Sequence, residues 1–154
     1  LYSKEFFYRR VREELQAHPD REYDMLCSNI ENFKLINDIL GVPAGDQLLI
    51  SVAEMIQEKI ANMEMLIQAG RGLVYNATML LDQGKPCNKE ASIAKCFVTE
   101  AYGKITDDAL QIFGGYGLCD EYLISKLYRD ARVNRIIEGT NEIQRVVIAK
   151  SLLR

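Results

Sequence analysis

A carboxylate in a short polar turn near the C-terminal end of the sequence is the residue best suited to chemistry. Glu138 is followed by Gly139 and Thr140, and an amphipathic segment begins directly after them. Ile136 and Ile137 precede the carboxylate and offer it an apolar approach. A carboxylate removes protons near neutral pH when exclusion of water raises its pKa. Glu138 is therefore a residue whose type suits proton transfer where water is excluded, and Gly139 beside it has no Cβ.

A glycine-rich turn is the second candidate for a functional role. Gly114, Gly115 and Gly117 follow a helical apolar pattern that ends near Phe113. Glycines allow a ligand to approach the backbone because no Cβ intervenes. Each motif alone also has an ordinary explanation, since Gly114 and Gly115 would suit a helix C-cap and Glu138 a surface carboxylate.

Composition excludes several classes of function. The 154 residues carry a net charge of −3, and 48% of them are hydrophobic, which is enough for a packed core. No basic stretch suits nucleic acid, and no apolar run is long enough to cross a membrane. The four cysteines lack CxxC spacing and His18 is the single histidine, so we expect no metal site and reduced thiols in the cytoplasm. Because the sequence starts at Leu1, we expect a fragment of a longer chain.

Periodicity in the first half predicts helices and one strand. Residues 2–17 show a helical pattern that His18 and Pro19 end. Residues 23–30 form a short apolar run between polar residues, which predicts a buried strand. Residues 32–40 are predicted to be helical, and a long helix is predicted over residues 43–82 because apolar residues recur there at steps of three and four.

Three more helices are predicted in the second half. They cover residues 88–113, with Asn88 as the N-cap, and residues 121–131 and 141–153. Short joins between helices predict an antiparallel bundle. The fold expected is therefore mostly α, a helical bundle with a short α/β segment at the N-terminal end. The helix predicted over residues 88–113 has an expected inner face made of Ala91, Ala94, Phe97, Val98, Ala101, Ile105, Ala109 and Ile112.

Residues 1–55 resemble part of a GGDEF (diguanylate cyclase) domain. The residues that carry the resemblance are Phe33, Lys34, Ile36, Asn37, Asp38, Gly41, Gly45, Asp46, Leu48 and Leu49. The resemblance implies that Asn37 and Asp46 face a guanine base. Asn29 and Glu31 stand at the family's acidic positions, and Val42 replaces its histidine. Because the signature turn is absent and an amide is a poor magnesium ligand, we expect a packing unit without cyclase activity.

Residues 56–154 resemble the C-terminal helical domain of an acyl-CoA dehydrogenase. Four ordered motifs carry the resemblance, at residues 82–86, 107–117, 129–132 and 137–145. Lys150 is a minor departure, since many family members have arginine there. The resemblance implies an FAD-dependent α,β-dehydrogenation of an acyl-CoA thioester.

The resemblance also assigns roles to individual residues. Glu138 would be the catalytic base and Gly139 would lie against the substrate, while Thr140, Asn141 and Glu142 would touch the flavin. The FAD of a neighbouring subunit would be held by the second motif, namely Gln111, Ile112, Phe113, Gly114 and Gly115.

The two resemblances together predict an incomplete chain. The family's middle β-domain, N-terminal helical domain and first C-terminal helix have no counterpart in this sequence, so we expect a fragment that is inactive alone. The resemblances meet near residues 52–60, inside the predicted long helix, which suggests a chimera of domains 1–55 and 56–154. A strand over residues 23–30 would need a partner, and we therefore expect a homo-oligomer.

Two other functions stay open from the sequence, a non-enzymatic helical assembly and a degenerate guanine-nucleotide-binding module. A colourless protein that binds no FAD would favour the helical assembly. Guanine-nucleotide binding that is lost in Asp46→Ala would favour the nucleotide module.

Overall fold

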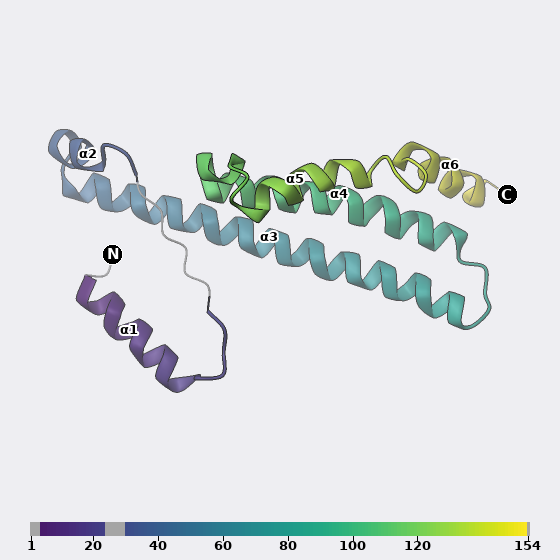
Figure 1. The fold of residues 1–154 in the computed structure, drawn as a ribbon, viewed down its shortest axis with the longest axis horizontal. Coiled ribbons are helices and arrows are strands. Elements are labelled where there is room, and N and C mark those ends of the chain that lie inside the picture. The colour runs from purple at the N-terminus through teal and green to yellow at the C-terminus, as the bar shows by residue number, and fades with distance from the viewer. Residues whose placement is uncertain (1–3, 24–29, 154) are drawn as a thin grey trace. The chain divides into compact units, whose positions relative to one another are not determined.

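The computed structural model describes residues 4–23 and 30–153, and all regular structure in these ranges is helical (Figure 1). Six α-helices and one 3-10 helix follow one another in this part of the chain. The chain divides into two units, residues 1–55 and 56–154. None of the helices in the described ranges is long and apolar enough to cross a membrane.

The first unit contains α1 (Lys4–Ala17), α2 (Phe33–Leu40) and the beginning of α3 (Val42–Asp82). α2 ends at Gly41, whose φ of 87° is the left-handed conformation that glycine adopts without strain. The Gly41 N–H donates to the carbonyl of Asn37 at 2.9 Å and closes the helix. The strand predicted over residues 23–30 is not seen in its described ends, because Tyr23 and Ile30 belong to no regular element. Residues 24–29, including Asn29, lie outside the described residues.

α3 extends over 41 residues, which corresponds to roughly 60 Å at 1.5 Å per residue. Its end at Asp82 was predicted by the glycine and proline that follow. Gly84 has a φ of 66°, its N–H donates to the carbonyl of Leu81, and the N–H of Lys85 donates to Leu80, each at 2.9 Å. These two bonds satisfy carbonyls that the helix itself leaves unpaired.

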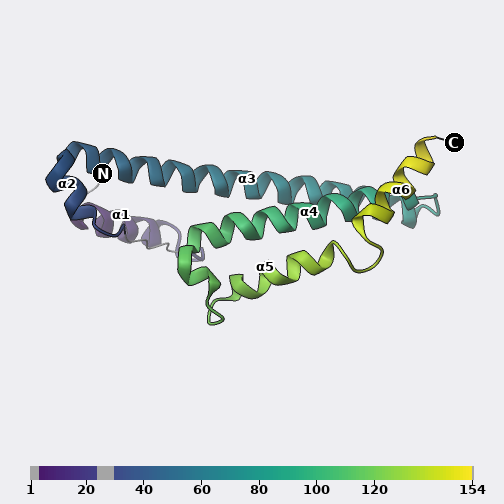
Figure 2. The same ribbon diagram turned by 90° about the horizontal axis from the view of Figure 1, so that it is seen from above.

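The second unit is arranged around α4 (Asn88–Phe113). The 3-10 helix η1 (Gly114–Leu118) follows it, and then α5 (Leu123–Asn134) and α6 (Asn141–Leu152). Figure 2 shows α4 returning alongside the second part of α3, and α5 running back along α4 in the opposite direction. α4 packs on both α5 and α6. The predicted mostly helical, antiparallel arrangement is confirmed.

Small and polar side chains fill the interior of the second unit. The buried apolar residues are Ala77, Ala94, Cys96, Ala101, Ile124 and Ala131. The buried polar residues are Ser92, Thr106, Asp108, Ser125 and Asn141. Because small side chains bury little apolar surface, this packing depends strongly on specific hydrogen bonds.

Three local predictions in the second unit were wrong. The N-cap of α4 is Cys87 and not Asn88, and the N–H of Ala91 donates to the Cys87 carbonyl at 2.8 Å. Ala91 is exposed rather than on the inner face. The helix predicted over residues 121–131 begins and ends later, because the chain after η1 forms further turns before α5 starts.

An ion pair joins α3 to α4 beside an open apolar groove. The ammonium of Lys59 donates to Asp108, whose second oxygen accepts from Lys104 at 3.1 Å. These two hydrogen bonds, that from Lys59 foremost, lower the pKa of Asp108 below its ordinary value. The groove has a volume of about 380 Å³. Its lining residues from the two helices are Leu66, Ile67, Gly70, Arg71, Val74, Tyr75, Val98, Ala101, Tyr102 and Ile105.

Replacing Lys59 by methionine is expected to lower the free energy of unfolding by about 1–3 kcal/mol, because Asp108 then loses its most buried partner. Lys104→Met is the matched control, since its side chain is 63% exposed against 23% for Lys59, and its loss should cost less than about 1 kcal/mol. Urea denaturation of both variants measures the difference. Equal effects would show that the burial of Lys59 contributes nothing.

The same ion pair predicts a pH dependence. A carboxylate whose pKa is lowered on folding stabilises the folded state above its ordinary pKa of 3.8. That stabilisation is lost as the pH falls below 3.8 toward the lowered value, because the unfolded chain then binds the proton more readily. Asp108→Asn should therefore flatten the fall of the urea midpoint in this acid range.

Candidate functional site

The turn between α5 and α6 carries the predicted base. Glu138 has a φ of 53° and Gly139 a φ of 81°, so two consecutive residues are left-handed. Glycine adopts this conformation freely, whereas for glutamate it costs about 1–2 kcal/mol. A residue persists in such a conformation only when its surroundings hold it there.

Side chains from two helices hold the carbonyls of this turn. Lys95 of α4 donates to the carbonyl of Gly139 at 2.8 Å. Gln144 of α6 donates to the carbonyls of Glu138 and Gly139 at 3.2 and 3.5 Å. The hydroxyl of Thr140 accepts from the N–H of Ile143 at 3.4 Å, so Thr140 is the N-cap of α6.

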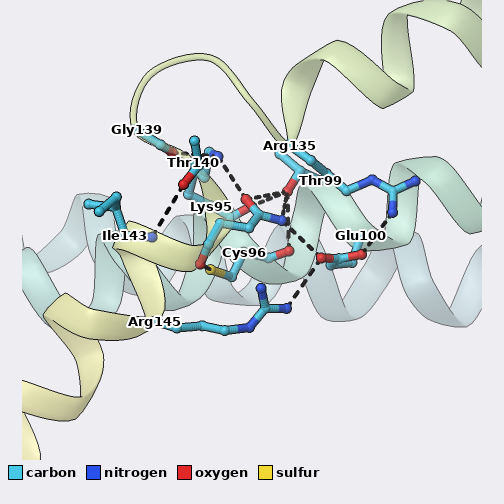
Figure 3. A network of polar contacts seen from close by, with 10 residues as sticks. Lys95, Cys96, Thr99, Glu100, Arg135, Gly139, Thr140, Ile143 and Arg145 are labelled. Carbon is cyan, nitrogen blue, oxygen red and sulfur yellow. Dashed lines mark hydrogen bonds and ion pairs between the residues drawn. The ribbon is translucent and has the colours of Figure 1, made fainter.

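A network of polar contacts links the turn to α4 (Figure 3), and the hydrogen bonds place the buried Asn141 at its centre. The residue is 2% exposed, and its Nδ2 donates to Thr99 Oγ1 at 2.9 Å and to Glu100 Oε1 at 3.0 Å. Its Oδ1 accepts from Lys95 Nζ at 2.7 Å. Its own N–H donates to the carbonyl of Arg135 at 3.1 Å, which ties the end of α5 to the start of α6. Asn141 thus fixes both ends of the turn to α4.

Glu100 pairs with two arginines from the neighbouring segments of the chain. The carboxylate accepts from Arg135 Nη1 and from Arg145 Nη2, each at 3.2 Å. The hydrogen bond from Asn141, aided by these two guanidinium groups, lowers the pKa of Glu100. A Cβ on Gly103 would lie 2.6 Å from Arg135 Nη2, so a larger residue there would displace this guanidinium.

Glu138 itself lies outside this network, in an exposed region. Glu138 and Gly139 are exposed, and Ile136 and Ile137 are 52% and 47% exposed. The apolar approach predicted for the base therefore faces outward instead of closing over it. The next acidic residue, Glu142, has a lowered pKa because its own N–H and the Thr140 hydroxyl at the start of α6 bond to its carboxylate.

The glycine-rich turn presents open backbone at the far end of α4. Gly114 has a φ of 61°, and a Cβ on Gly114 or Gly115 would meet no atom within 4 Å. Gly117 is buried, and a Cβ there would lie 2.9 Å from the Cβ of Phe113. The rings of Phe113 and Tyr122 meet edge to face at 5.8 Å beside the turn. Backbone that is exposed and free of neighbours on one side is open to a ligand or to another chain.

One chain does not bring the two predicted motifs together. The base turn contacts α4 at Lys95, whereas the glycine-rich turn begins at Gly114, 19 residues further along that helix, which corresponds to roughly 28 Å. Figure 2 shows the two turns at opposite ends of α5. A ligand that contacts both motifs of one chain would have to span that separation.

The two residues predicted to face a guanine base lie in α2 and near the start of α3. Oδ1 of Asn37 is buried without a hydrogen-bond partner, and a Cβ on Gly45 would lie 1.8 Å from it. Asp46 is exposed. The Asn37 side chain thus packs against Gly45 at the start of α3.

Sequence reasoning missed the residues of α4 that hold the base turn. Thr99 stands one turn after Lys95 and shares its face of the helix, and Glu100 directly follows Thr99. The sequence feature that could have identified them is that these polar residues alternate with the predicted inner-face residues of the same helix. The predictions that Asn141 contacts a flavin and that Glu138 is a base stay predictions, although the side chain of Asn141 is fully engaged within the protein.

Comparisons with known proteins match both parts of the chain. Residues 43–153 match the family described as acyl-CoA dehydrogenase, C-terminal domain, and residues 1–73 match the diguanylate cyclase GGDEF domain. Cyclohexane-1-carbonyl-CoA dehydrogenase of Geobacter metallireducens is 48% identical over 101 residues, which cover 66% of this chain and 27% of that protein. The chain therefore spans about a quarter of the length of this relative.

Solved structures give the same match for the helical bundle. Butyryl-CoA dehydrogenase from Megasphaera elsdenii superposes with a TM-score of 0.62 at 44% identity, over 64% of this chain and 26% of that chain. A complex of PigA with FAD superposes with a TM-score of 0.61 at 28% identity, over 63% of this chain and 25% of that one.

Asn141→Ala is expected to lower the free energy of unfolding by about 2–4 kcal/mol, because it removes the hydrogen bonds that join this buried amide to Lys95, Thr99 and Glu100 of α4. Asn134→Ala is the matched control, since Asn134 makes one hydrogen bond, to the carbonyl of Asp130, and should cost less than about 1 kcal/mol. Chemical denaturation of the two variants measures the difference. A loss in Asn141→Ala no larger than in the control would contradict the central role of this amide.

Proposed function

Since the chain belongs to the acyl-CoA dehydrogenase family through its C-terminal domain, we propose that it carries the base-bearing part of a flavin-dependent acyl-CoA dehydrogenase site. In this proposal Glu138 removes the α-proton of an acyl-CoA thioester. The observation that carries the proposal is the turn itself, in which a strained backbone is held from α4 and α6 at an exposed glutamate. Strain that the surroundings maintain at an exposed carboxylate is typical of a functional position.

The residues of the chain divide the work of such a site. The Glu138 carboxylate accepts the proton from the α-carbon, and the electron pair of the broken C–H bond forms the new double bond. Gly139 has no side chain and so leaves space for the thioester. A Cβ at this position would lie 2.8 Å from Gln144 Nε2. FAD, when bound, would supply the oxidising chemistry, as the acceptor for the hydride that leaves the β-carbon. Thr140 and Glu142, at the start of α6, offer a hydroxyl and a helix N-terminus toward the cofactor.

The open backbone at Gly114 and Gly115 is suited to the cofactor as well. In the proposed assembly it contacts the FAD of a neighbouring copy, together with Gln111, Ile112 and Phe113. The separation of the two turns along α4, roughly 28 Å, supports this division, because one FAD beside Glu138 would have to extend over that distance to reach the second turn of the same chain. A homo-oligomer is therefore part of the proposal.

We infer further that the chain is inactive on its own. A general base for an α-proton has to be shielded from water, and Glu138 is exposed. The match covers about a quarter of a catalytic relative, so other segments would have to close over the carboxylate and stabilise the thioester oxygen.

The N-terminal part is proposed to be a GGDEF-like packing unit joined to the bundle through α3. The two family matches overlap over residues 43–73, which all lie within this one helix. Such an overlap is what a splice through a shared amphipathic helix would produce. It supports a chimera of domains 1–55 and 56–154, with the change near residues 52–60.

The test of Glu138 places this bundle in a complete enzyme. Residues 56–154 replace the matching segment of the Geobacter relative, and the flavin spectrum is followed after addition of its acyl-CoA. Reduction of the flavin is expected, whereas Glu138→Gln should slow it by about 10²- to 10⁴-fold with the flavin still bound. The present chain alone should show no turnover with added FAD.

Glu64→Gln provides the control, because Glu64 is an exposed carboxylate of α3 that accepts only from Gln68 among its described contacts. Its rate should equal that of the unsubstituted hybrid. Flavin reduction that is equally fast in the hybrid carrying Glu138→Gln would exclude Glu138 as the base.

A further inference from the structure

The backbone of the base turn is held by a single charged side chain that belongs to neither of the flanking helices. We propose that Lys95 is a positioning residue for Glu138, and that it acts by fixing the left-handed backbone of residues 138 and 139. This inference rests on the proposed function, because the direction of the Glu138 side chain matters only if Glu138 is the base.

The geometry of the Lys95 ammonium fits this role. Nζ donates to the carbonyl of Gly139 at 2.8 Å and to Oδ1 of Asn141 at 2.7 Å, so it joins the turn to the first residue of α6 (Figure 3). An ammonium has three donors, and bonds made by charged donors are stronger than neutral ones. The charged bond from Lys95 thus holds the Gly139 carbonyl toward α4.

The second bond of Lys95 ends on a firmly held atom. Asn141 is buried and is bound in turn by Thr99 and Glu100, so its Oδ1 cannot move with the turn. A donor anchored at both ends resists rotation of the backbone beside Glu138. Such a rotation would release Glu138 from its φ of 53° and turn its Cα–Cβ bond away.

Gln144 contacts the same carbonyls but is the weaker support. Its neutral amide donates at 3.2 and 3.5 Å, longer than both bonds of Lys95. It also extends from α6, which itself depends on Asn141 for its position. Loss of Lys95 is therefore expected to loosen the turn even though Gln144 remains.

The test measures the turn directly by NMR in the whole chain. Lys95→Met removes both hydrogen bonds and keeps an unbranched stem. The backbone amide of Asn141, which donates to Arg135, should then exchange with solvent about tenfold faster or more. The three-bond coupling between the amide and α protons of Glu138 should move as its φ leaves the left-handed region. Lys95→Arg should restore both values in part.

Lys89→Met is the matched control, because Lys89 lies on the same helix and pairs with Glu90 away from the turn. It should change neither readout. Unchanged exchange and coupling in Lys95→Met would overturn the proposal. It would also be overturned if exchange rose equally throughout α4, α5 and α6, since that would indicate general destabilisation.

Neither readout involves flavin or thioester. Failure of Glu138 as a base in the hybrid enzyme would therefore leave these results unchanged, and failure of Lys95 to hold the turn would leave that experiment unchanged.

Discussion

The side-chain amide of Asn141 lies buried where α4, α5 and α6 meet, and each hydrogen bond left unmade there would cost about 1–3 kcal/mol. Its partners Lys95, Thr99 and Glu100 stand close together on α4. The start of α6 can satisfy the amide only opposite these residues, because a shift along α4 would separate the amide from them. The position of the base turn follows from this requirement, since the turn connects α5 to the residue that is fixed.

Polar specificity of this kind compensates for a modest apolar interior. Most of the buried apolar residues of the second unit are alanines, and the larger apolar side chains of α3 and α4 line a groove that stays open. Alanines let helices approach closely but bury little surface. The packing of α4 against its neighbours therefore relies on Asp108 and Asn141, where geometry decides the outcome more than area does.

Local rules in the sequence predicted what local chemistry controls. Gly114 ends α4 as expected, α2 and α3 end close to Gly41 and Gly84, and Thr140 caps α6, because each effect involves residues within one turn of the chain. Asn88 was the predicted cap of α4, but the cap is the preceding residue, Cys87, a difference that side-chain preference cannot resolve. The contacts of Lys95 with Gly139 and of Asn141 with Glu100 join residues more than forty positions apart, so no periodicity could reveal them.

The left-handed backbone of Glu138 also bears on which residues could stand at this position over time. Asparagine, aspartate and glycine enter that conformation more easily than glutamate does. Aspartate would keep the charge but would bring the carboxylate nearer the backbone by about 1.5 Å, the length of one carbon–carbon bond. Glutamate thus has the longer side chain but the more strained backbone at this position. A lineage that no longer needed the reach would be expected to drift toward the easier residues, so the identity of residue 138 serves as a record of whether selection still acts on that turn.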